Sequence, residues 1–433
     1  MLQKFKKNDI HYSRAQLLIN VLFLTSAISL SLTTLGYYIS YQLSLFVMPS
    51  AALIYIALTW LVKQNINLNL IGNIFVVISS VVIITMMTFS GGIFSPVAPW
   101  IAAGPTFALL LINRKSAWFW SAIMLIVVAS FSILEALDKT PPIQYNSETK
   151  PLYFFVVYAS LIFIMLMVNL IFEKNKNDAL AKVEEANKNI KASINYARRI
   201  QNAILPTSEE MNSLFKKHFV IYKPKDLISG DFYWTAEIAN KRFIAVADCT
   251  GHGVPGALMS MIGNELLNKI LFEKKITETN KILNELHNDL CTALRQSATE
   301  VKDGMDIILC AFSQDTLEFS GAKNALYYTL NGEFYNLAAD RASIGGDNLT
   351  RNYQIHHINT QKGMTFYLTT DGFQDQFGGE KKKKFTIGKL KNALQEVSSY
   401  NIQEQKEKLD FILHNWKKEE EQTDDILVIG IEL

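Results

Sequence analysis

The sequence predicts three structural parts: an all-α membrane bundle of six spans, a helical coiled-coil connector, and an α+β domain in which helices flank a β-sandwich. The chain of 433 residues is too long for one average domain, so several units are expected. Its first third is almost free of charge, a heptad repeat follows, and strand and helix patterns fill the remainder. The predicted boundaries are 1–16 for an N-terminal segment, 17–172 for the bundle, 173–206 for the connector and 207–433 for the α+β domain.

The composition excludes several classes of protein. Lys+Arg number 42 and Asp+Glu number 40, and this balance does not indicate nucleic acid as a partner. The three cysteines form no CxxC pattern and are too few for a disulfide scaffold, so reduced thiols are expected. The charges are unevenly spread, because the stretch from Ala15 to Phe172 holds only Lys63, Arg114, Lys115, Glu135, Asp138, Lys139, Glu148 and Lys150.

Six apolar stretches approach the length that a membrane-spanning helix requires, which is about 20 residues. They cover 17–40, 43–62, 68–89, 96–112, 117–134 and 152–172. The fourth is the weakest because three prolines interrupt it, although proline is tolerated in membrane helices. No small-residue cleavage site precedes the second stretch, so a cleavable signal peptide is not expected.

Basic residues orient the predicted bundle. They precede the first span, lie in alternate loops and follow the last span: Lys4, Lys6, Lys7, Arg14, Lys63, Arg114, Lys115, Lys174 and Lys176. The loops after the first and third spans carry no basic residue, and the two lysines of 138–150 are balanced by acids. By the positive-inside rule, the sequence predicts a multi-pass protein of the plasma (inner) membrane with both termini in the cytoplasm.

The predicted spans lack ionisable residues, which argues against the alternative of a transporter with a regulatory tail. Asn73 and Asn169 are the few amides inside the spans, and we expect them to join helices. The bundle is therefore interpreted as an anchor or a receiver of signals.

A heptad series continues from the sixth span through Leu180, Val183, Asn187, Ile190, Ile194, Ala197, Gln201 and Ile204. It predicts a parallel homodimeric coiled coil over 180–204, in which Asn187 and Gln201 fix the register of the seam. A single amphipathic helix lying on the following domain is the alternative. Pro206 ends the helix, because proline cannot continue it.

Short strands and longer helices alternate after Pro206. Strands are predicted at 219–222, 231–236, 243–247, 307–312, 325–330, 333–337, 364–369 and 426–432. Helices are predicted at 254–272, 280–297, 387–397 and 404–416. Two separated pairs of helices in a strand-rich sequence indicate a sandwich with helices on its outer faces.

Acidic residues stand at the ends of four predicted strands: Asp231 in SGDFYW, Asp248 in FIAVADCTGHG, Asp371 in MTFYLTTDG, and Asp424 with Asp425 in TDDILVIG. Converging carboxylates repel one another unless a hard cation lies between them, and Mg²⁺ or Mn²⁺ suits such ligands. A single acid of this kind is explained as a turn former, since Asp-Gly ends many strands. Four of them together favour a metal site.

The motifs SGDFYW, ADCTGHGVPGALMSMIG, DGMDIILC, TDG and DDILVIG resemble, in this order, the SpoIIE-like branch of the metal-dependent PPM (type 2C) Ser/Thr protein phosphatases. The segment YARRIQNAILP is similar to the helix that precedes such domains in membrane-bound members. The resemblance covers about residues 194–433 and does not reach the six spans.

The resemblance implies a centre of two Mn²⁺ or Mg²⁺ ions in which Asp248 bridges both. The implied ligands are the side chains of Asp231, Asp248, Asp371 and Asp424, the backbone carbonyl of Cys249, and Asp425 as the alternative to Asp424. Water bound between the metals would attack the phosphorus of phosphoserine or phosphothreonine in a protein substrate. A catalytically silent signalling scaffold of the same fold is the alternative function.

Several further residues accompany these motifs. His252 is a candidate acid for the leaving oxygen or a structural turn residue, and Cys249 is not expected to be a nucleophile. Asp306 either supports the metal ligands or simply begins a strand. The lysines of 381–384 form a solvated loop or a dock for an acidic substrate. No arginine stands just upstream of Asp231, where eukaryotic members of the family bind phosphate, so phosphate binding is assigned to no residue.

Overall fold

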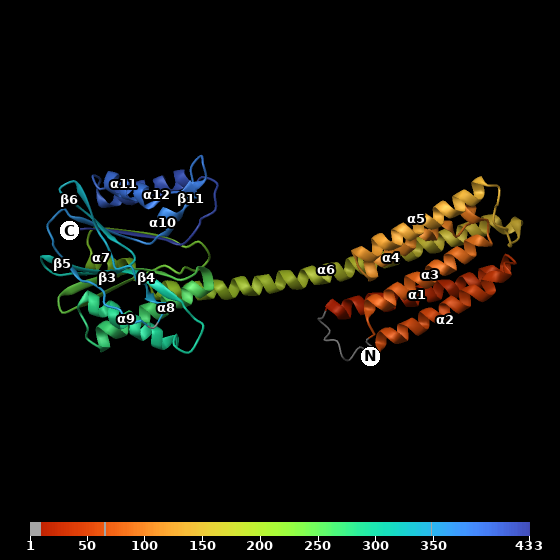
Figure 1. The fold of residues 1–433 in the computed structure, drawn as a ribbon, viewed down its shortest axis with the longest axis horizontal. Coiled ribbons are helices and arrows are strands. Elements are labelled where there is room, and N and C mark those ends of the chain that lie inside the picture. Colours follow the sequence, from red (N-terminus) through yellow and green to blue (C-terminus); the bar gives the residue numbers. More distant parts are fainter. Residues whose placement is uncertain (1–9, 65, 348) are drawn as a thin grey trace. The chain divides into compact units, whose positions relative to one another are not determined.

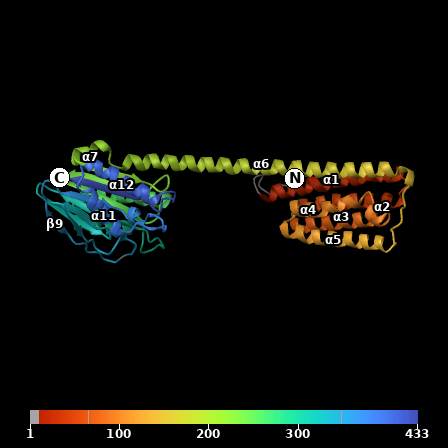
Figure 2. The ribbon, with the colours of Figure 1, turned by 90° about the horizontal axis from the view of Figure 1, so that it is seen from above.

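The computed structural model describes residues 10–64, 66–347 and 349–433. The chain divides into two compact units with the boundary between Ala186 and Asn187. The first unit is helical, and Figure 2 shows its helices running side by side. Its helices are α1 (Ile10–Tyr38), α2 (Gln42–Lys63), α3 (Leu68–Thr88), α4 (Ala103–Leu111), α5 (Arg114–Ala136) and the first part of α6 (Lys150–Ile204).

Five of these helices, α1, α2, α3, α5 and α6, are long and apolar enough to cross a membrane. The fourth predicted span differs from the others. It forms a 3-10 turn, η2 (Ala98–Ala102), followed by α4, and together they make one short apolar helix. Proline cannot donate the backbone hydrogen bond of a regular helix, which accounts for this short, interrupted element. The presence of several apolar helices is confirmed, and the six-span topology stays a prediction.

The two intramembrane amides behave differently. Asn73 joins two helices as expected, because the indole Nε1 of Trp120 on α5 donates to its Oδ1 at 3.1 Å. Asn169 bonds within its own helix, where its Nδ2 donates to the carbonyl of Met165 at 2.8 Å. Asn73 makes the same kind of bond to the carbonyl of Asn69 in addition to its bond with Trp120. The contact of Asn169 therefore does not test its expected role, which stays a prediction.

The connector is the second part of α6, which ends at Ile204, just before Pro206 as predicted. The side chains of Leu180, Val183 and Ile190 are 56%, 58% and 57% exposed, so an apolar stripe is open on this helix. Gln201 corrects the heptad assignment. Its side chain is 3% exposed and bonds to Ser229 within the α+β unit, so it is not part of the open stripe.

The second unit is a sandwich of two antiparallel sheets. One sheet has the order β1-β13-β10-β6-β7 and the other the order β2-β3-β4-β5-β9, with β8 added to β4. The first sheet consists of β1 (His218–Lys223), β13 (Ile426–Glu432), β10 (Thr365–Thr369), β6 (Leu326–Leu330) and β7 (Glu333–Leu337). The second consists of β2 (Phe232–Ile238), β3 (Lys241–Cys249), β4 (Gly304–Phe312), β5 (Thr316–Ala322), β9 (His356–Asn359) and β8 (Ile344–Gly345). A small hairpin of β11 (Phe377–Gly378) and β12 (Lys383–Lys384) stands apart.

Helices cover both outer faces of the sandwich, as Figure 1 shows. The pair α8 (Gly253–Asn268) and α9 (Thr279–Ala293) lies on one sheet, and the pair α11 (Ile387–Val397) and α12 (Ile402–Lys417) on the other. Alternation along β3 explains the layers, since successive strand residues point to opposite faces. Ile244 and Val246 pack between the sheets, whereas Phe243 and Ala245 pack beneath α8 and α9.

The predicted sandwich with two helical pairs is confirmed, but several elements were not predicted. They include α7 (Ser208–Leu214), α10 (Gly372–Asp375) and the strands β5, β8, β9, β11 and β12. The predicted helix 254–272 is α8 followed by one π-helical turn, Lys269–Glu273. The short α10 follows β10 and begins directly after Asp371.

Candidate active site

The first acid of the candidate site lies at the end of β3. Asp248 pairs with Asp306 across β3 and β4, and the chain then turns sharply into α8. Gly251 and Gly253 have φ values of +84° and +65° in this turn, a region that L side chains rarely adopt. Thr250 fixes the turn, because its amide donates to the carbonyl of Gly304 at 2.9 Å.

Three of the predicted acids meet in one cleft. Asp248, Asp371 and Asp424 line it together with Cys249 and His252. Asp371 follows β10 and Asp424 precedes β13, and these two strands are neighbours in one sheet, while Asp248 comes from the other sheet. The cleft therefore forms where strand ends of the two sheets meet.

Asp231 lies behind these acids. Its side chain is 2% exposed, and its Oδ2 accepts a hydrogen bond from Thr370 Oγ1 at 2.7 Å. Thr370 directly precedes Asp371, so this bond ties the loop before β2 to the end of β10. Burial, together with the charges of Asp425 and Asp371, raises the pKa of Asp231 well above its usual value.

The same effects act on the other acids. Burial raises the pKa of Asp248 to about 10, and the charges of Asp231 and Asp371 add to this shift. Burial also raises the pKa of Asp371, as do the charges of Asp375 and Asp424. Each carboxyl group is thus held where its ionised form is disfavoured, and a nearby cation would reverse that preference.

The chemistry of these groups fits hard divalent cations. Carboxylate oxygens and a backbone carbonyl are ligands that Mg²⁺ and Mn²⁺ prefer, whereas structural zinc sites rely on Cys and His. As placed, the described residues include no group of three His, Cys, Asp or Glu side chains that is close enough to hold a metal ion. The acids therefore share a cleft of suitable chemistry without forming a closed cage.

Asp424 and Asp425 occupy different positions. Asp424 faces the cleft, and its Oδ1 accepts a hydrogen bond from the amide of Asp425 at 2.8 Å. Asp425 is 3% exposed, and its two oxygens accept from the amides of Lys225 at 2.7 Å and Gly230 at 2.6 Å. Asp425 thus holds the loop that leads to Asp231, a role that the TDD motif alone did not reveal.

His252 stands at the rim of the cleft. Its Nδ1 forms a hydrogen bond with Oδ2 of Asp226 at 2.8 Å, and both side chains are 49% exposed. A carboxylate that contacts one ring nitrogen fixes the orientation of the imidazole. Sequence reasoning missed Asp226, which belongs to no motif and stands 26 positions before His252.

Cys249 lacks the features of a nucleophile. The thiol is free and buried, and burial raises its pKa well above the usual value, as does the charge of Asp248. A thiol of this kind stays protonated near neutral pH and is unreactive.

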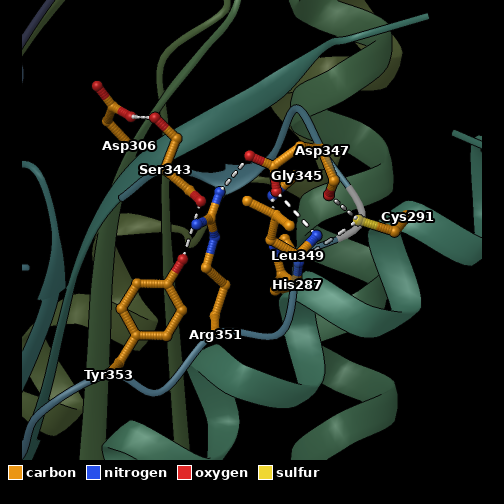
Figure 3. Close-up of polar contacts among 9 residues, drawn as sticks. All are labelled: His287, Cys291, Asp306, Ser343, Gly345, Asp347, Leu349, Arg351 and Tyr353. Atoms are coloured by element: carbon orange, nitrogen blue, oxygen red, sulfur yellow. Dashed lines mark hydrogen bonds and ion pairs between the residues drawn. The ribbon is translucent and has the colours of Figure 1, made fainter. Parts of the chain in front are cut away.

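A network of polar contacts, shown in Figure 3, includes two residues that line the cleft, Asp306 and Ser343. Ser343 Oγ donates to Oδ1 of Asp306 at 2.6 Å, and the hydroxyl of Tyr353 donates to the carbonyl of Ser343 at 2.9 Å. The amide of Gly345 donates to Nδ1 of His287 on α9 at 3.0 Å. The loop between β7 and β9 is thereby fixed to α9, and Asp306 is part of the cleft rather than an ordinary strand residue.

Lys323 is the only lysine or arginine among the described residues that line the cleft. It is 52% exposed, and its Nζ lies 3.5 Å from Oδ2 of Asp306. Sequence reasoning missed it because no motif includes it, and only the pairing of β4 with β5 places it opposite Asp306. The lysine hairpin 381–384 also has partners, since Lys384 pairs with Asp375 at 2.6 Å.

The α+β unit is similar to known proteins. The family model for "Stage II sporulation protein E (SpoIIE)" matches residues 239–433. The SiaA-PP2C domain of Pseudomonas aeruginosa is 34% identical with a TM-score of 0.53, and the match covers 57% of this chain and 98% of that domain. The PP2C phosphatase domain with a regulatory fragment of SpoIIE from Bacillus subtilis is 18% identical with a TM-score of 0.42, covering 50% of this chain and 62% of that one.

A third structure, the S. agalactiae serine/threonine phosphatase, is 15% identical with a TM-score of 0.40. The match covers 50% of this chain and 99% of that one. No curated protein gives a significant match. The SiaA comparison extends over nearly the whole of a related domain at an identity that establishes kinship, and the SpoIIE family match covers most of the same region. This chain belongs to the SpoIIE-like branch of the metal-dependent PPM (type 2C) phosphatases, and its C-terminal unit is a PP2C-type Ser/Thr phosphatase domain.

Proposed function

We propose that this protein is a membrane-anchored phosphatase that hydrolyses phosphoserine or phosphothreonine on a cytoplasmic signalling protein, with an output regulated through the helical unit and α6. The observation that carries the proposal is the meeting of Asp248, Asp371 and Asp424 in one cleft, with Asp231 buried behind them. Five helices that are long and apolar enough to span a bilayer support the anchoring. The distribution of basic residues supports an inner-membrane protein with cytoplasmic termini.

The metal chemistry would be supplied by two Mn²⁺ or Mg²⁺ ions, which the family normally uses. The residues that would hold them are Asp231, Asp248, Asp371, Asp424 and the backbone carbonyl of Cys249. When bound, such ions lower the pKa of the attacking water and neutralise charge on the phosphoryl group.

The chain's own residues account for the remaining steps. His252, oriented by Asp226, can hold a proton near the leaving oxygen of the serine or threonine. Lys323 is placed to attract the substrate phosphate to the wall of an otherwise acidic cleft. Asp425 keeps Asp231 in position by binding two backbone amides of the preceding loop.

Contacts of α6 support the proposed regulation. Gln201 Nε2 donates to the carbonyl of Ser229 at 2.6 Å and to Ser260 Oγ at 2.9 Å, and its Oε1 accepts from the amide of Ser229 at 3.1 Å. Ser229 lies two residues before Asp231, and Ser260 lies on α8, the helix that follows Asp248. A rotation or shift of α6 would therefore act on both segments that carry proposed ligands.

The open stripe of Leu180, Val183 and Ile190 supports a homodimer through the 180–204 segment. Exposed apolar side chains at heptad spacing are favourable only when another surface covers them. In a parallel dimer this stripe would become the seam, while Gln201 would keep its contacts within each phosphatase domain.

A test of the proposed function uses full-length protein in lipid nanodiscs, stripped of metal with a chelator. Phosphate release from phosphoserine and phosphothreonine peptides is then measured before and after Mn²⁺ or Mg²⁺ is restored. The proposal predicts release only after restoration. A folded protein that binds the ions and releases no phosphate from any peptide would instead support the silent scaffold.

A further inference from the structure

The helical unit contains a cavity of about 70 Å³, which is partly continuous with the outside. Its walls come from α1, α2, α3, the η2–α4 segment and α6, and they are mostly apolar. Well-packed helical bundles leave little free space between helices, since protein interiors approach the density of organic crystals. A cavity of this size between membrane helices is therefore a feature to be explained.

Most polar groups on the cavity wall are satisfied by neighbours. The hydroxyls of Tyr55 and Ser79 bond to each other at 2.9 Å. The hydroxyl of Tyr41 donates to the carbonyl of Met86 at 3.1 Å, and Trp100 Nε1 donates to the carbonyl of Val157 at 3.3 Å. These groups need no ligand.

Tyr153 on α6 is the exception. Its side chain is 3% exposed, it lines the cavity, and its buried hydroxyl has no hydrogen-bond partner. Ser90 Oγ is not its partner and bonds instead to the carbonyl of Met86 at 2.6 Å and to Ser95 Oγ at 2.5 Å. An orphaned hydroxyl in an apolar interior is unfavourable and rare, so it points to a missing partner.

The ring of Tyr153 is fixed in place, which gives its hydroxyl a defined direction. Its centroid lies 6.2 Å from that of Tyr41 and 5.0 Å from that of Tyr145, both at edge-to-face angles. Such aromatic contacts hold each ring against the others. The hydroxyl therefore cannot turn away to find another partner without breaking this cluster.

We propose that this cavity binds a neutral, mostly apolar molecule with one hydrogen-bond acceptor oxygen, which the hydroxyl of Tyr153 would contact. The walls supply apolar contacts for the body of the ligand and one free donor for its oxygen. None of the described residues that line the cavity is charged, so an ionised group would lack a counter-charge there. A slender medium-chain alcohol has the required chemistry.

The site gives the proposed regulation an input. Tyr153 and Val157 belong to α6, the helix that ends near Gln201, so an occupant would contact the element that also reaches the phosphatase domain. This consequence rests on the proposed function, whereas binding to the cavity does not depend on it.

Photolabelling with azioctanol, a photoreactive medium-chain alcohol, tests the site in full-length protein in nanodiscs. Labelled peptides are identified by mass spectrometry, with excess octanol as competitor. Saturable labelling of cavity-lining peptides is expected. Tyr153→Phe removes only the hydroxyl. It should weaken the affinity for the alcohol about fivefold, which is the effect of one lost hydrogen bond. Tyr158→Phe is the matched control, because Tyr158 lies on the same helix and is 40% exposed.

A second pair of variants fills the cavity. Ala103 lines it and is 1% exposed, whereas its neighbour Ala102 is exposed. Ala103→Leu should abolish saturable labelling, and Ala102→Leu should leave it unchanged. Labelling that is spread over lipid-facing side chains, or that is equal in Tyr153→Phe and the wild type, would overturn the proposal. Phosphatase activity is not read in this experiment, so its outcome is independent of the catalytic proposal.

Discussion

The carboxylate of Asp425 accepts a hydrogen bond from the backbone amide of Gly230 at 2.6 Å. This contact joins the segment before β13 to the residue that precedes Asp231, across 195 positions of sequence. Gly230 cannot be replaced, because a Cβ there would lie 2.6 Å from the carbonyl oxygen of Gly251 and 3.3 Å from that of Cys249. Three loops that carry proposed ligands thus meet at Gly230: two pack backbone to backbone, and the third contributes the carboxylate of Asp425.

The neighbours Asp424 and Asp425 should respond differently to the same substitution. Asp425→Asn loses one of the two buried carboxylate oxygens that accept from backbone amides, and it should destabilise the domain by about 1–3 kcal/mol. Asp424→Asn should abolish phosphate release with little change in stability, because its side chain faces the cleft. Thermal unfolding and phosphatase assays of both variants check this. Equal loss of stability in the two variants would contradict the distinction.

Metal removal should abolish hydrolysis, and Asp248→Asn should be the most damaging single substitution, because the family resemblance implies that its carboxylate would serve both ions. Asp231→Asn and Asp371→Asn should also be severe. Phosphate release from a phosphopeptide or p-nitrophenyl phosphate is measured with Mn²⁺, with Mg²⁺ and with excess EDTA. Undiminished activity in EDTA would contradict the two-metal proposal.

Cys249→Ser should have a mild effect, because only the backbone carbonyl of this residue is proposed to act. The thiol is buried, and burial raises its pKa well above the usual value, so it contributes no nucleophile. The assay is kcat with a phosphopeptide, with circular dichroism as the check on folding. A folded but inactive variant would require a thiol mechanism to be considered.

Lys323→Ala should raise KM for phosphopeptides by about tenfold, the effect of one charged hydrogen bond to phosphate, with a smaller change in kcat. We expect this effect because the ammonium group of Lys323 lies on the wall of the described cleft, where it is half exposed and close to Asp306. Lys323→Arg keeps the charge and should recover much of the affinity. An unchanged KM in Lys323→Ala would remove this residue from substrate binding.

The sequence was sufficient for the features that local pattern determines. The apolar stretches of the helical unit and the apolar runs of β3 and β13 each follow from residues close together in the chain, and most of these elements were predicted within a few residues. The acids of the cleft were identified because motifs mark them. The strand β5 was missed because Ser320, Gly321 and Ala322 give it a weak strand pattern, and its pairing with β4 determines its structure.

The contributions of Asp425, Asp226 and Lys323 could not be predicted for a different reason. Each depends on a partner distant in sequence, such as Gly230 for Asp425 and Asp306 for Lys323. Gln201 was assigned to a coil seam because heptad spacing records only helical periodicity. In the structure Gln201 instead contacts Ser229 and Ser260. Helical periodicity identifies the residues that share a face, but it does not identify the surface that covers that face.

The last prediction concerns the phase of α6. Between Phe172 and Leu180 the helix is unbroken, so no flexible hinge interrupts it before the heptad series. A continuous helix transmits rotation and register, whereas a flexible Gly/Ser tether transmits neither. Deleting three or four residues within 180–190 would rotate Gln201 and everything after it relative to the apolar stripe. Deleting seven would preserve the phase and shorten the helix by about 10 Å.

Phosphatase activity of the full-length protein in membranes should therefore change after the three- or four-residue deletion and largely survive the seven-residue deletion. Gln201→Ala in the undeleted chain should weaken the dependence on phase, because it removes the contacts from α6 to Ser229 and Ser260. Chemical crosslinking at position 183 reports in each variant whether the dimer seam is intact. Equal activity across the whole deletion series, with the dimer preserved, would show that α6 is only a tether.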